Sequence, residues 1–422
     1  MKIKSYQRHL NMTEINFVML INGGSIGIYS RIDSYQRLGQ RRLATICVVL
    51  FLGTLNTLAH AQANNVTLYG IADGGITYTN NQGGASSTQA TSGGLGSSRW
   101  GLTGLENLGG GMSTIFKLES GFNLQTGQLL QNGREFGRLA YVGLSSQWGT
   151  LTLGRQDDVM GDYLGAYSGS VQFSGPLGTH AGDLDNIFIS YKLSNTVKYA
   201  SPSLGGFSFG GLYGVGGVSG SVGTNQLWGM AAHYAGGPFS ASAVYHHIND
   251  PAVTYFDGAA TASSNTPFSN PVNNPIYLGY SSAASLDAFG VGAGLTIGAS
   301  TIGVNLTSTQ FNRVVKTATT PRGGASPSIT SVEVAYSARI IAAAVVGISY
   351  AYTHADEAKY SQVTLGTQYF LSKRTRLYAE AAWQHASGID STGRAAVADL
   401  TTVSASSTGN QIAARVGISV RF

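Results

Sequence analysis

The chain ends with Ile412-Ala413-Ala414-Arg415-Val416-Gly417-Ile418-Ser419-Val420-Arg421-Phe422, a stretch whose side chains alternate in character. Every second residue from Ile412 to Phe422 is apolar, whereas most of the residues between them are small or basic. A β-strand directs successive side chains to opposite faces, so the alternation predicts a strand with one apolar face. A soluble β-sandwich would alternate in the same way, so the fold class depends on how often the pattern recurs.

The period of two recurs along the whole chain from Gln62 onward. It is clear at 362–371 and again at 377–384. Counting such segments, we expect sixteen strands. They lie at 65–79, 98–106, 111–122, 134–146, 149–156, 194–201, 206–214, 226–235, 238–247, 286–298, 300–312, 330–340, 341–354, 358–371, 374–386 and 410–422.

The connections between these strands alternate in length. The short ones include 107–110, 147–148, 202–205, 236–237 and 372–373. The long ones include 80–97, 157–193, 248–285, 313–329 and 387–409. Tight turns at one end and long loops at the other are typical of a transmembrane β-barrel, whereas a sandwich has no reason to separate them.

Composition favours a membrane barrel over membrane helices. Hydrophobic residues make up 43% of the chain, and the longest apolar candidate, 340–348, falls far short of the about 20 residues that a spanning helix needs. A sheet in lipid must close on itself because unpaired backbone groups are costly there. A ring of sixteen strands is wide enough to hold water. The sequence therefore predicts an all-β protein, a 16-stranded antiparallel transmembrane β-barrel around a channel.

The first 61 residues have the layout of an exported protein's leader. Arg41 and Arg42 precede an apolar stretch at 43–58, and the small-residue box Ala59-His60-Ala61 follows it. We expect a cleaved N-terminal extension plus signal peptide at 1–61 and a barrel at 62–422. A single membrane anchor and a later translation start, at Met19, remain alternatives.

Charge and cysteine content exclude several classes of function. Cys47 is the single cysteine and lies in the leader, so the mature chain has no thiol or disulfide chemistry. Seven of the 25 Lys and Arg residues and two of the 20 Asp and Glu residues precede Gln62, which leaves 18 of each sign. The mature chain is therefore not basic, and we expect no nucleic-acid partner.

Several motifs together resemble those of the trimeric general porins of Gram-negative bacteria, of the β-proteobacterial type. They are Val66-Thr67-Leu68-Tyr69-Gly70, Ser98-Arg99-Trp100-Gly101, 104–111, 117–122, 137–144 and 149–156. The resemblance implies an outer-membrane homotrimer that passes small hydrophilic solutes and ions passively and without a cofactor. It also implies contact with outer-membrane lipid and lipopolysaccharide.

In the resembled family, the third loop folds into the barrel and narrows it opposite a set of arginines. By matched position this constriction loop is 157–193, with Arg99 and Arg138 on the opposing wall. The loop acids are Asp157, Asp158, Asp162, Asp183 and Asp185. Parity of the strands independently directs both arginines inward. It also directs inward four secondary lumen charges, Lys117, Lys198, Arg415 and Arg421. Acids and bases balance in number, so the residues leave ion preference open, and the resemblance leans toward anions.

Two further residues receive separate expectations. Arg155 shares a strand face with Leu151 and Leu153. Without a β-bulge it points outward, where it could form an ion pair at a subunit interface; with a bulge it points into the pore. The terminal aromatic, Phe422, corresponds to the residue that the outer-membrane assembly machinery reads in the family.

Other functions find weaker support in the sequence. A barrel enzyme would need a nucleophile and an acid beside one of the histidines, and none accompanies His233, His246, His247, His354 or His385. There is no metal-binding or nucleotide-binding motif, so we expect no enzyme activity, no metal and no cofactor. An outer-membrane channel with a saturable site for one substrate remains the alternative to a general porin.

Overall fold

The computed structural model describes residues 18–22, 25–29, 65–259 and 268–422. The chain forms two units, Met1–Ala61 and Gln62–Phe422. In the first, β1 (Val18–Asn22) pairs antiparallel with β2 (Ser25–Tyr29). The expected signal sequence at 41–61, with Cys47, lies outside the described residues.

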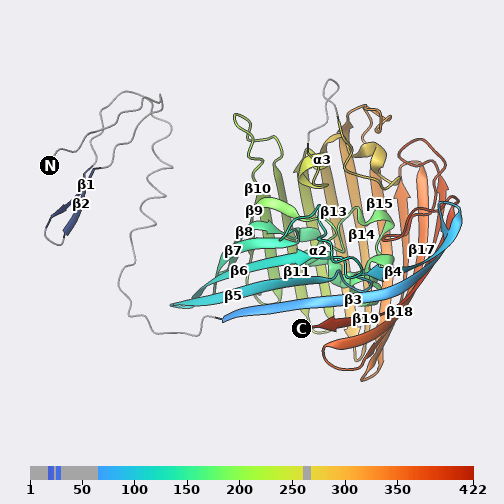
Figure 1. Cartoon of the computed structure of the whole chain (residues 1–422), viewed down its shortest axis with the longest axis horizontal. Coiled ribbons are helices and arrows are strands. Elements are labelled where there is room, and N and C mark those ends of the chain that lie inside the picture. The colour runs from blue at the N-terminus through green and yellow to red at the C-terminus, as the bar shows by residue number, and fades with distance from the viewer. Residues whose placement is uncertain (1–17, 23–24, 30–64, 260–267) are drawn as a thin grey trace. The chain divides into compact units, whose positions relative to one another are not determined.

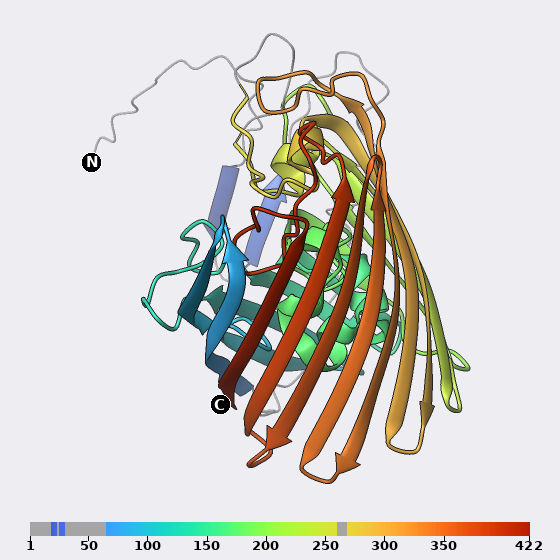
Figure 2. The same ribbon diagram turned by 90° about the vertical axis from the view of Figure 1, so that its right-hand side faces the viewer.

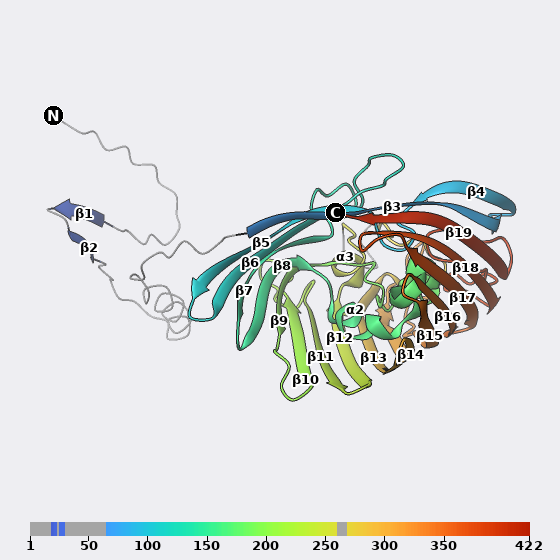
Figure 3. The same cartoon turned by 90° about the horizontal axis from the view of Figure 1, so that it is seen from below.

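The second unit is a closed antiparallel β-barrel, seen from below in Figure 3. Its first strand, β3 (Asn65–Gln82), pairs with its last, β19 (Asn410–Arg421), and this pairing closes the ring. The strands between them are β4 (Ala85–Ser92), β5 (Arg99–Gly109), β6 (Met112–Gly121), β7 (Leu139–Ser146), β8 (Gly149–Gln156), β9 (Leu193–Ala200), β10 (Phe207–Gly214), β11 (Leu227–Gly236), β12 (Phe239–Asn249), β13 (Ala283–Ile297), β14 (Ser300–Val314), β15 (Ser328–Ile341), β16 (Ala344–Ala355), β17 (Ala358–Phe370) and β18 (Thr375–Gly388).

Two of these strands share one position in the ring. The C-terminal part of β3, 74–82, pairs with β4, and its N-terminal part, 65–71, pairs with β5. The strands β4 and β5 together therefore form one interrupted strand. The barrel therefore has sixteen strand positions, as predicted. Residues 93–98 interrupt this strand because the Asp73 carboxylate accepts hydrogen bonds from the backbone amides of Gly94 and Leu95. The sequence had assigned 80–97 wholly to a loop.

A second difference concerns the start of β7. We expected this strand from residue 134, but it begins at Leu139. Residues 122–138 form a loop instead, and the Arg134 amide donates to the Gln131 carbonyl at 3.4 Å in a turn where the strand was expected to start.

Short and long connections lie at opposite ends of the barrel, as Figures 1 and 2 show. Two-residue turns join β7 to β8 and β11 to β12, while 157–192 and the described residues 250–259 and 268–282 belong to the other end. None of the helices in the described residues is long and apolar enough to cross a membrane.

The two faces of the barrel wall have opposite character. On β15, Val332 and Val334 point outward and are 43% and 50% exposed, whereas Ser331 and Glu333 point inward and are buried. This arrangement is the reverse of that in a soluble protein. It suits a barrel wall whose apolar outer face contacts lipid and whose polar inner face lines the lumen.

The segment 157–192 folds into the barrel and lies against its inner wall. It contains α2 (Val159–Leu164), η1 (Gly165–Tyr167), η2 (Ser170–Ser174), η3 (Gly175–Gly178) and η4 (Ala181–Asp183). Gln362 on β17 donates to the carbonyls of Leu177 and Thr179, at 2.9 and 3.0 Å. At Gly347 a Cβ would lie 2.2 Å from the Phe173 ring, so glycine permits the close approach. The inward constriction loop implied by the resemblance is thus present as a fold element.

A second connection also enters the barrel. In 389–409, Leu400 packs with Leu177, Ala382 and Ala413. Thr179 donates from its hydroxyl to that of Thr401 at 2.7 Å, so this connection contacts the constriction loop directly.

Candidate pore constriction

A cavity of about 550 Å³ lies between the constriction loop and the walls formed by β5–β7 and β17–β19. Its charged lining comprises six basic residues and two acidic ones, an excess of four positive charges. The basic residues are Arg99, Lys117, Arg138, Lys192, Arg376 and Arg421, and the acidic residues are Glu119 and Asp157. The structure therefore brings both predicted arginines to one site.

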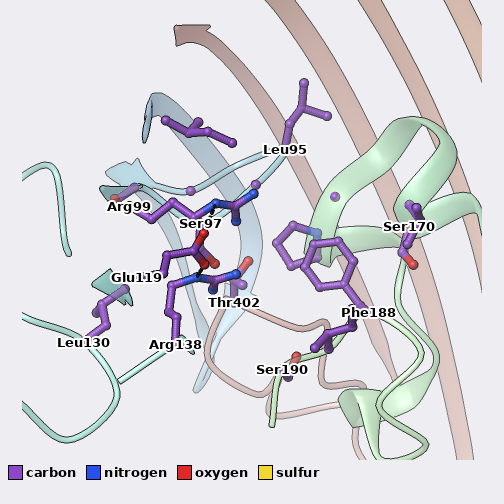
Figure 4. A pocket seen from close by; sticks show the side chains of 18 of the residues that line it. Leu95, Ser97, Arg99, Glu119, Leu130, Arg138, Ser170, Phe188, Ser190 and Thr402 are labelled. Atoms are coloured by element: carbon purple, nitrogen blue, oxygen red, sulfur yellow. Dashed lines mark hydrogen bonds and ion pairs between the residues drawn. The ribbon is translucent and has the colours of Figure 1, made fainter. Parts of the chain in front are cut away.

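Arg99 and Arg138 flank a carboxylate that sequence reasoning missed. The Nε of Arg138 donates to Glu119 Oε1 at 2.7 Å, and the Nε of Arg99 lies 3.5 Å from Oε2 (Figure 4). Tyr69 also donates to Oε2, at 2.8 Å. Gly121, which pairs with Arg99 across the strands, leaves room for the Arg138 side chain. Strand parity could have predicted that Glu119 points inward, because it shares a strand face with Lys117.

Asp157 and Lys192, at the two ends of the constriction loop, form an ion pair. Burial would raise the pKa of Asp157, but the Lys192 ammonium lowers it overall. Burial also lowers the pKa of Lys192 to about 8, despite the nearby carboxylate. Lys192 was not predicted, since a residue in an irregular loop has no strand parity to place it.

Asp162 lies away from this cavity and has its own partner. It accepts from Lys198 Nζ at 2.7 Å, and both residues line a smaller cavity with Lys117 and Tyr141. Each water-accessible carboxylate of the constriction loop is thus neutralised by a lysine.

The three remaining predicted acids are buried beneath the loop and do not line the large cavity. Asp158 caps α2 by accepting from the Gly161 amide at 3.1 Å and also accepts from Asn186 at 2.8 Å. Burial raises its pKa to about 7. Asp183 accepts from the Phe188 amide and the Ser190 hydroxyl. These side chains hold the loop's own turns, because a loop within a barrel must satisfy its backbone donors.

Asp185, the last of these acids, belongs to a buried clamp centred on His180. His180 Nδ1 contacts Asp185, and its Nε2 lies 3.2 Å from Glu333 of β15. Glu333 also accepts from the Gly169 amide at 2.9 Å. Burial alone would lower the pKa of His180, but the two carboxylates raise it well above its ordinary value. The clamp joins the loop to the wall, and neither His180 nor Glu333 was predicted.

Arg155 does not point outward as simple parity suggested. The register shifts between Gly154 and Gln156, and Gly154 has φ of +140°. The Arg155 side chain is therefore buried and contacts Asp257 of the same chain through both Nη atoms, at 3.2 and 2.8 Å. Because of this bulge, Arg155 faces Asp257 of its own chain and not the outer surface.

Three of the four secondary charges line cavities, and the fourth, Arg415, is buried in the wall. Lys117 and Arg421 line the large cavity, and Lys117 and Lys198 line the smaller one. Arg415 is 2% exposed and donates to the Thr77 hydroxyl at 2.7 Å, so it supports the wall beneath residues 93–98. Arg376 lines the large cavity and was missed, although it shares an inward face of β18 with Tyr378.

The constriction loop presents three apolar side chains to the large cavity beside the exposed Ser190, whose hydroxyl donates to Asp183. Val171 is 50% exposed, and Phe188 and Ile189 are half-buried. Figure 4 shows Phe188 on the side opposite Arg99 and Arg138. An acidic surface was expected there; the acids instead pair with lysines or turn inward.

The histidines form no catalytic arrangement that the contacts of the described residues reveal. His246 is buried 3.8 Å from Asp158, and His247 contacts Asp287 on the barrel wall. Within the described ranges, no three His, Cys, Asp or Glu side chains are grouped so as to hold a metal.

The closed antiparallel ring, its lipid-type outer face and its charged lumen define a transmembrane β-barrel channel. A family description, Gram-negative porin, matches residues 44–388, and the chain belongs to this family. It is therefore an outer-membrane protein whose water-filled channel allows passive diffusion of small hydrophilic solutes and ions.

Individual relatives agree with this assignment. An outer membrane porin protein of Bordetella pertussis is 39% identical over 172 residues, which are 36% of this chain and 43% of that protein. Outer membrane porin protein 32 of Delftia acidovorans is 29% identical over 76% of this chain and 84% of its own length. Among solved structures, an anion-selective porin from Comamonas acidovorans is 25% identical, covers 85% of this chain and all of its own, and has a TM-score of 0.66.

Proposed function

We propose that the channel conducts anions in preference to cations and that the large cavity is its selectivity site. The supporting observation is the excess of four basic residues in the cavity lining. Glu119 lies between two arginines and Asp157 contacts Lys192, so neither carboxylate is free to attract a cation. A solved relative is described as an anion-selective porin, which supports the same preference for anions.

The size of the preference follows from the dielectric of the site. Two unit charges about 8 Å apart in water interact by roughly 0.5 kcal/mol, which is comparable to thermal energy. Several like charges on a low-dielectric wall focus a stronger field. Selectivity is therefore a bias that leaves cations some passage, and arginine maintains it because guanidinium does not lose its proton.

Reversal potentials in a KCl gradient across planar bilayers test this proposal. The wild-type channel should favour chloride, and Arg99→Gln with Arg138→Gln should shift the potential toward the potassium value while Lys117, Lys192, Arg376 and Arg421 retain part of the preference. Arg313→Gln is the control, because Arg313 is exposed outside the cavity. Cation selectivity in the wild type, or an unchanged potential in the double variant, would contradict the proposal.

We also propose that the protein works as a homotrimer. A strand that spans a bilayer needs about 9–11 residues, whereas β7, β8 and β9 have eight each. This short part of the wall, with Leu144 and Leu153 exposed on its outer face, suits burial against neighbouring subunits. Conductance that inserts in groups of three would support the trimer, and single unit steps throughout would oppose it.

The roles proposed for the chain ends complete the model. Cleavage after Ala61 would release the barrel for export, and Phe422 would be read by the assembly machinery before the barrel enters the lipid and lipopolysaccharide of the outer membrane. The channel would work without catalysis, metal or cofactor. Amino-terminal sequencing of protein from outer membranes tests the cleavage site.

A further inference from the structure

The large cavity has two walls of different chemistry. One wall carries the guanidinium groups of Arg99 and Arg138. The other is the constriction loop, whose accessible side chains there include Val171, Phe188 and Ile189. Ser190 is exposed beside them, and its hydroxyl donates to Asp183. A solute that passes between the walls meets positive charge on one side and a patch of three apolar side chains on the other.

The absence of free charge on the loop surface follows from its contacts. Asp157 pairs with Lys192, and Asp183 turns under the loop to accept from the amide of Phe188. The Asp183 carboxylate therefore holds the loop's backbone and leaves the Phe188 ring on the cavity side. The apolar surface is thus produced by the fold of the loop itself.

Ile189 occupies an unusual backbone conformation at this surface. Its φ is +61°, which is rare for a β-branched residue. The Ile189 amide donates to the Asn186 carbonyl at 2.9 Å, and its carbonyl accepts from Lys192 Nζ at 3.0 Å. The lysine that neutralises Asp157 therefore also fixes the backbone that presents the apolar side chain.

We propose that the channel discriminates among anions and favours monocarboxylates with an apolar body over polar anions of the same charge. The carboxylate of such a solute faces Arg99 and Arg138, while its hydrocarbon part contacts Val171 and Phe188. A polyhydroxylated anion gains the same attraction to the arginines but must give up water at the apolar wall without replacing those hydrogen bonds. This inference rests on the proposed anion preference and adds the class of anion.

Hexanoate and gluconate form a suitable pair of probes, because both are linear six-carbon monocarboxylates and they differ in hydroxylation. Their permeabilities relative to chloride are measured from bi-ionic reversal potentials on the wild-type trimer in planar bilayers. The hexanoate-to-gluconate ratio, corrected for free-solution mobilities, should be several-fold above one. Val171→Ser with Phe188→Ser should lower it several-fold, to near one, as expected for losing some tens of Å² of apolar contact.

Three comparisons isolate the effect of the apolar wall. Val222→Ser removes an equally apolar side chain that is 80% exposed outside the cavity, and it should leave the ratio unchanged. Phe188→Leu keeps an apolar side chain and should retain most of the ratio. Because Phe188 and Val171 are accessible, the serine variants should insert as normal trimers, and their unit conductance in KCl checks this.

The possible results distinguish failure of the apolar preference from failure of the anion preference. A chloride-selective channel whose corrected hexanoate-to-gluconate ratio is near one overturns the apolar preference and leaves the anion preference intact. A ratio that the double serine variant does not change has the same meaning. A potassium-selective wild type overturns both.

Discussion

Arg138 donates from Nε to the Glu119 carboxylate at 2.7 Å, so the basic wall of the channel is built around one acid. Glu119 is almost completely buried and lies between Arg138 and Arg99. It holds two like charges side by side that would otherwise repel each other. The same carboxylate reduces the positive field that a passing ion experiences.

Glu119→Gln should therefore increase the preference for anions. The excess of basic residues in the cavity would rise from four to five, and one unit charge at about 8 Å changes the permeability of each ion roughly twofold in opposite directions, and so their ratio roughly fivefold. Reversal potentials in a KCl gradient measure the change. Glu106→Gln, at an exposed position on β5 outside the cavity, is the control, and a fall in the ratio for Glu119→Gln would contradict this role.

Anion preference should decline as pH rises through about 8. Burial lowers the pKa of Lys192 to about 8, so its ammonium is charged at neutral pH and is lost above that value, which leaves Asp157 unpaired. The permeability ratio of the wild type should fall about fourfold between pH 7 and pH 9. Lys192→Arg should flatten this profile because guanidinium keeps its charge. An identical decline in both proteins would exclude Lys192 as the source.

His180→Ala should loosen the constriction loop. The change leaves the carboxylates of Asp185 and Glu333 buried without their cation, and breaking a buried pair in this way costs about 3–5 kcal/mol. We expect larger open-channel noise and faster proteolysis within 157–192 than in the wild type. His385→Asn, at an exposed position near the rim, should behave as the wild type does.

The clamp also has a defined pH window. The carboxylates raise the pKa of His180 in the folded protein, so its contribution is complete below the ordinary value near 6.5 and is lost only as pH rises through the raised value. Open-channel noise in the wild type should therefore stay low at neutral pH and increase under alkaline conditions. Noise that increases on mild acidification from pH 7 to 6 would count against the clamp.

Gly70→Ala should weaken the closure of the barrel. Gly70 exchanges two backbone hydrogen bonds with Phe422, and an added Cβ would lie 2.3 Å from the Phe422 ring and 2.6 Å from the Arg99 carbonyl. Overpacking of this kind costs about 1–3 kcal/mol. The temperature at which the folded barrel unfolds on a gel should fall relative to Gly96→Ala, where the added Cβ meets no atom within 4 Å. Equal unfolding temperatures for the two variants would show that the contact between Gly70 and Phe422 accommodates the added methyl group without loss of stability.

The sequence alone determined the architecture and part of the site. A strand has a fixed period of two, so alternation located the sixteen strand positions and directed Arg99, Lys117 and Arg421 into the lumen. Arg138 also lines the cavity, but it lies in the loop before β7, where alternation does not apply. Closure followed from the same pattern, because a sheet in lipid cannot leave an edge. Glu119 and Arg376 were within reach of the same parity argument.

Only the tertiary structure decided how the constriction loop presents its side chains. Residues 157–192 have no repeating period, so spacing could not show that Asp158, Asp183 and Asp185 turn inward, that Lys192 returns to Asp157, or that Phe188 faces the arginines. The bulge that turns Arg155 to Asp257 was likewise left open. The Asp157–Lys192 and Arg155–Asp257 contacts join residues distant in sequence, about which a local pattern carries no information. The contacts of Asp158 and Asp183 are local, but they lie in turns that have no repeating period.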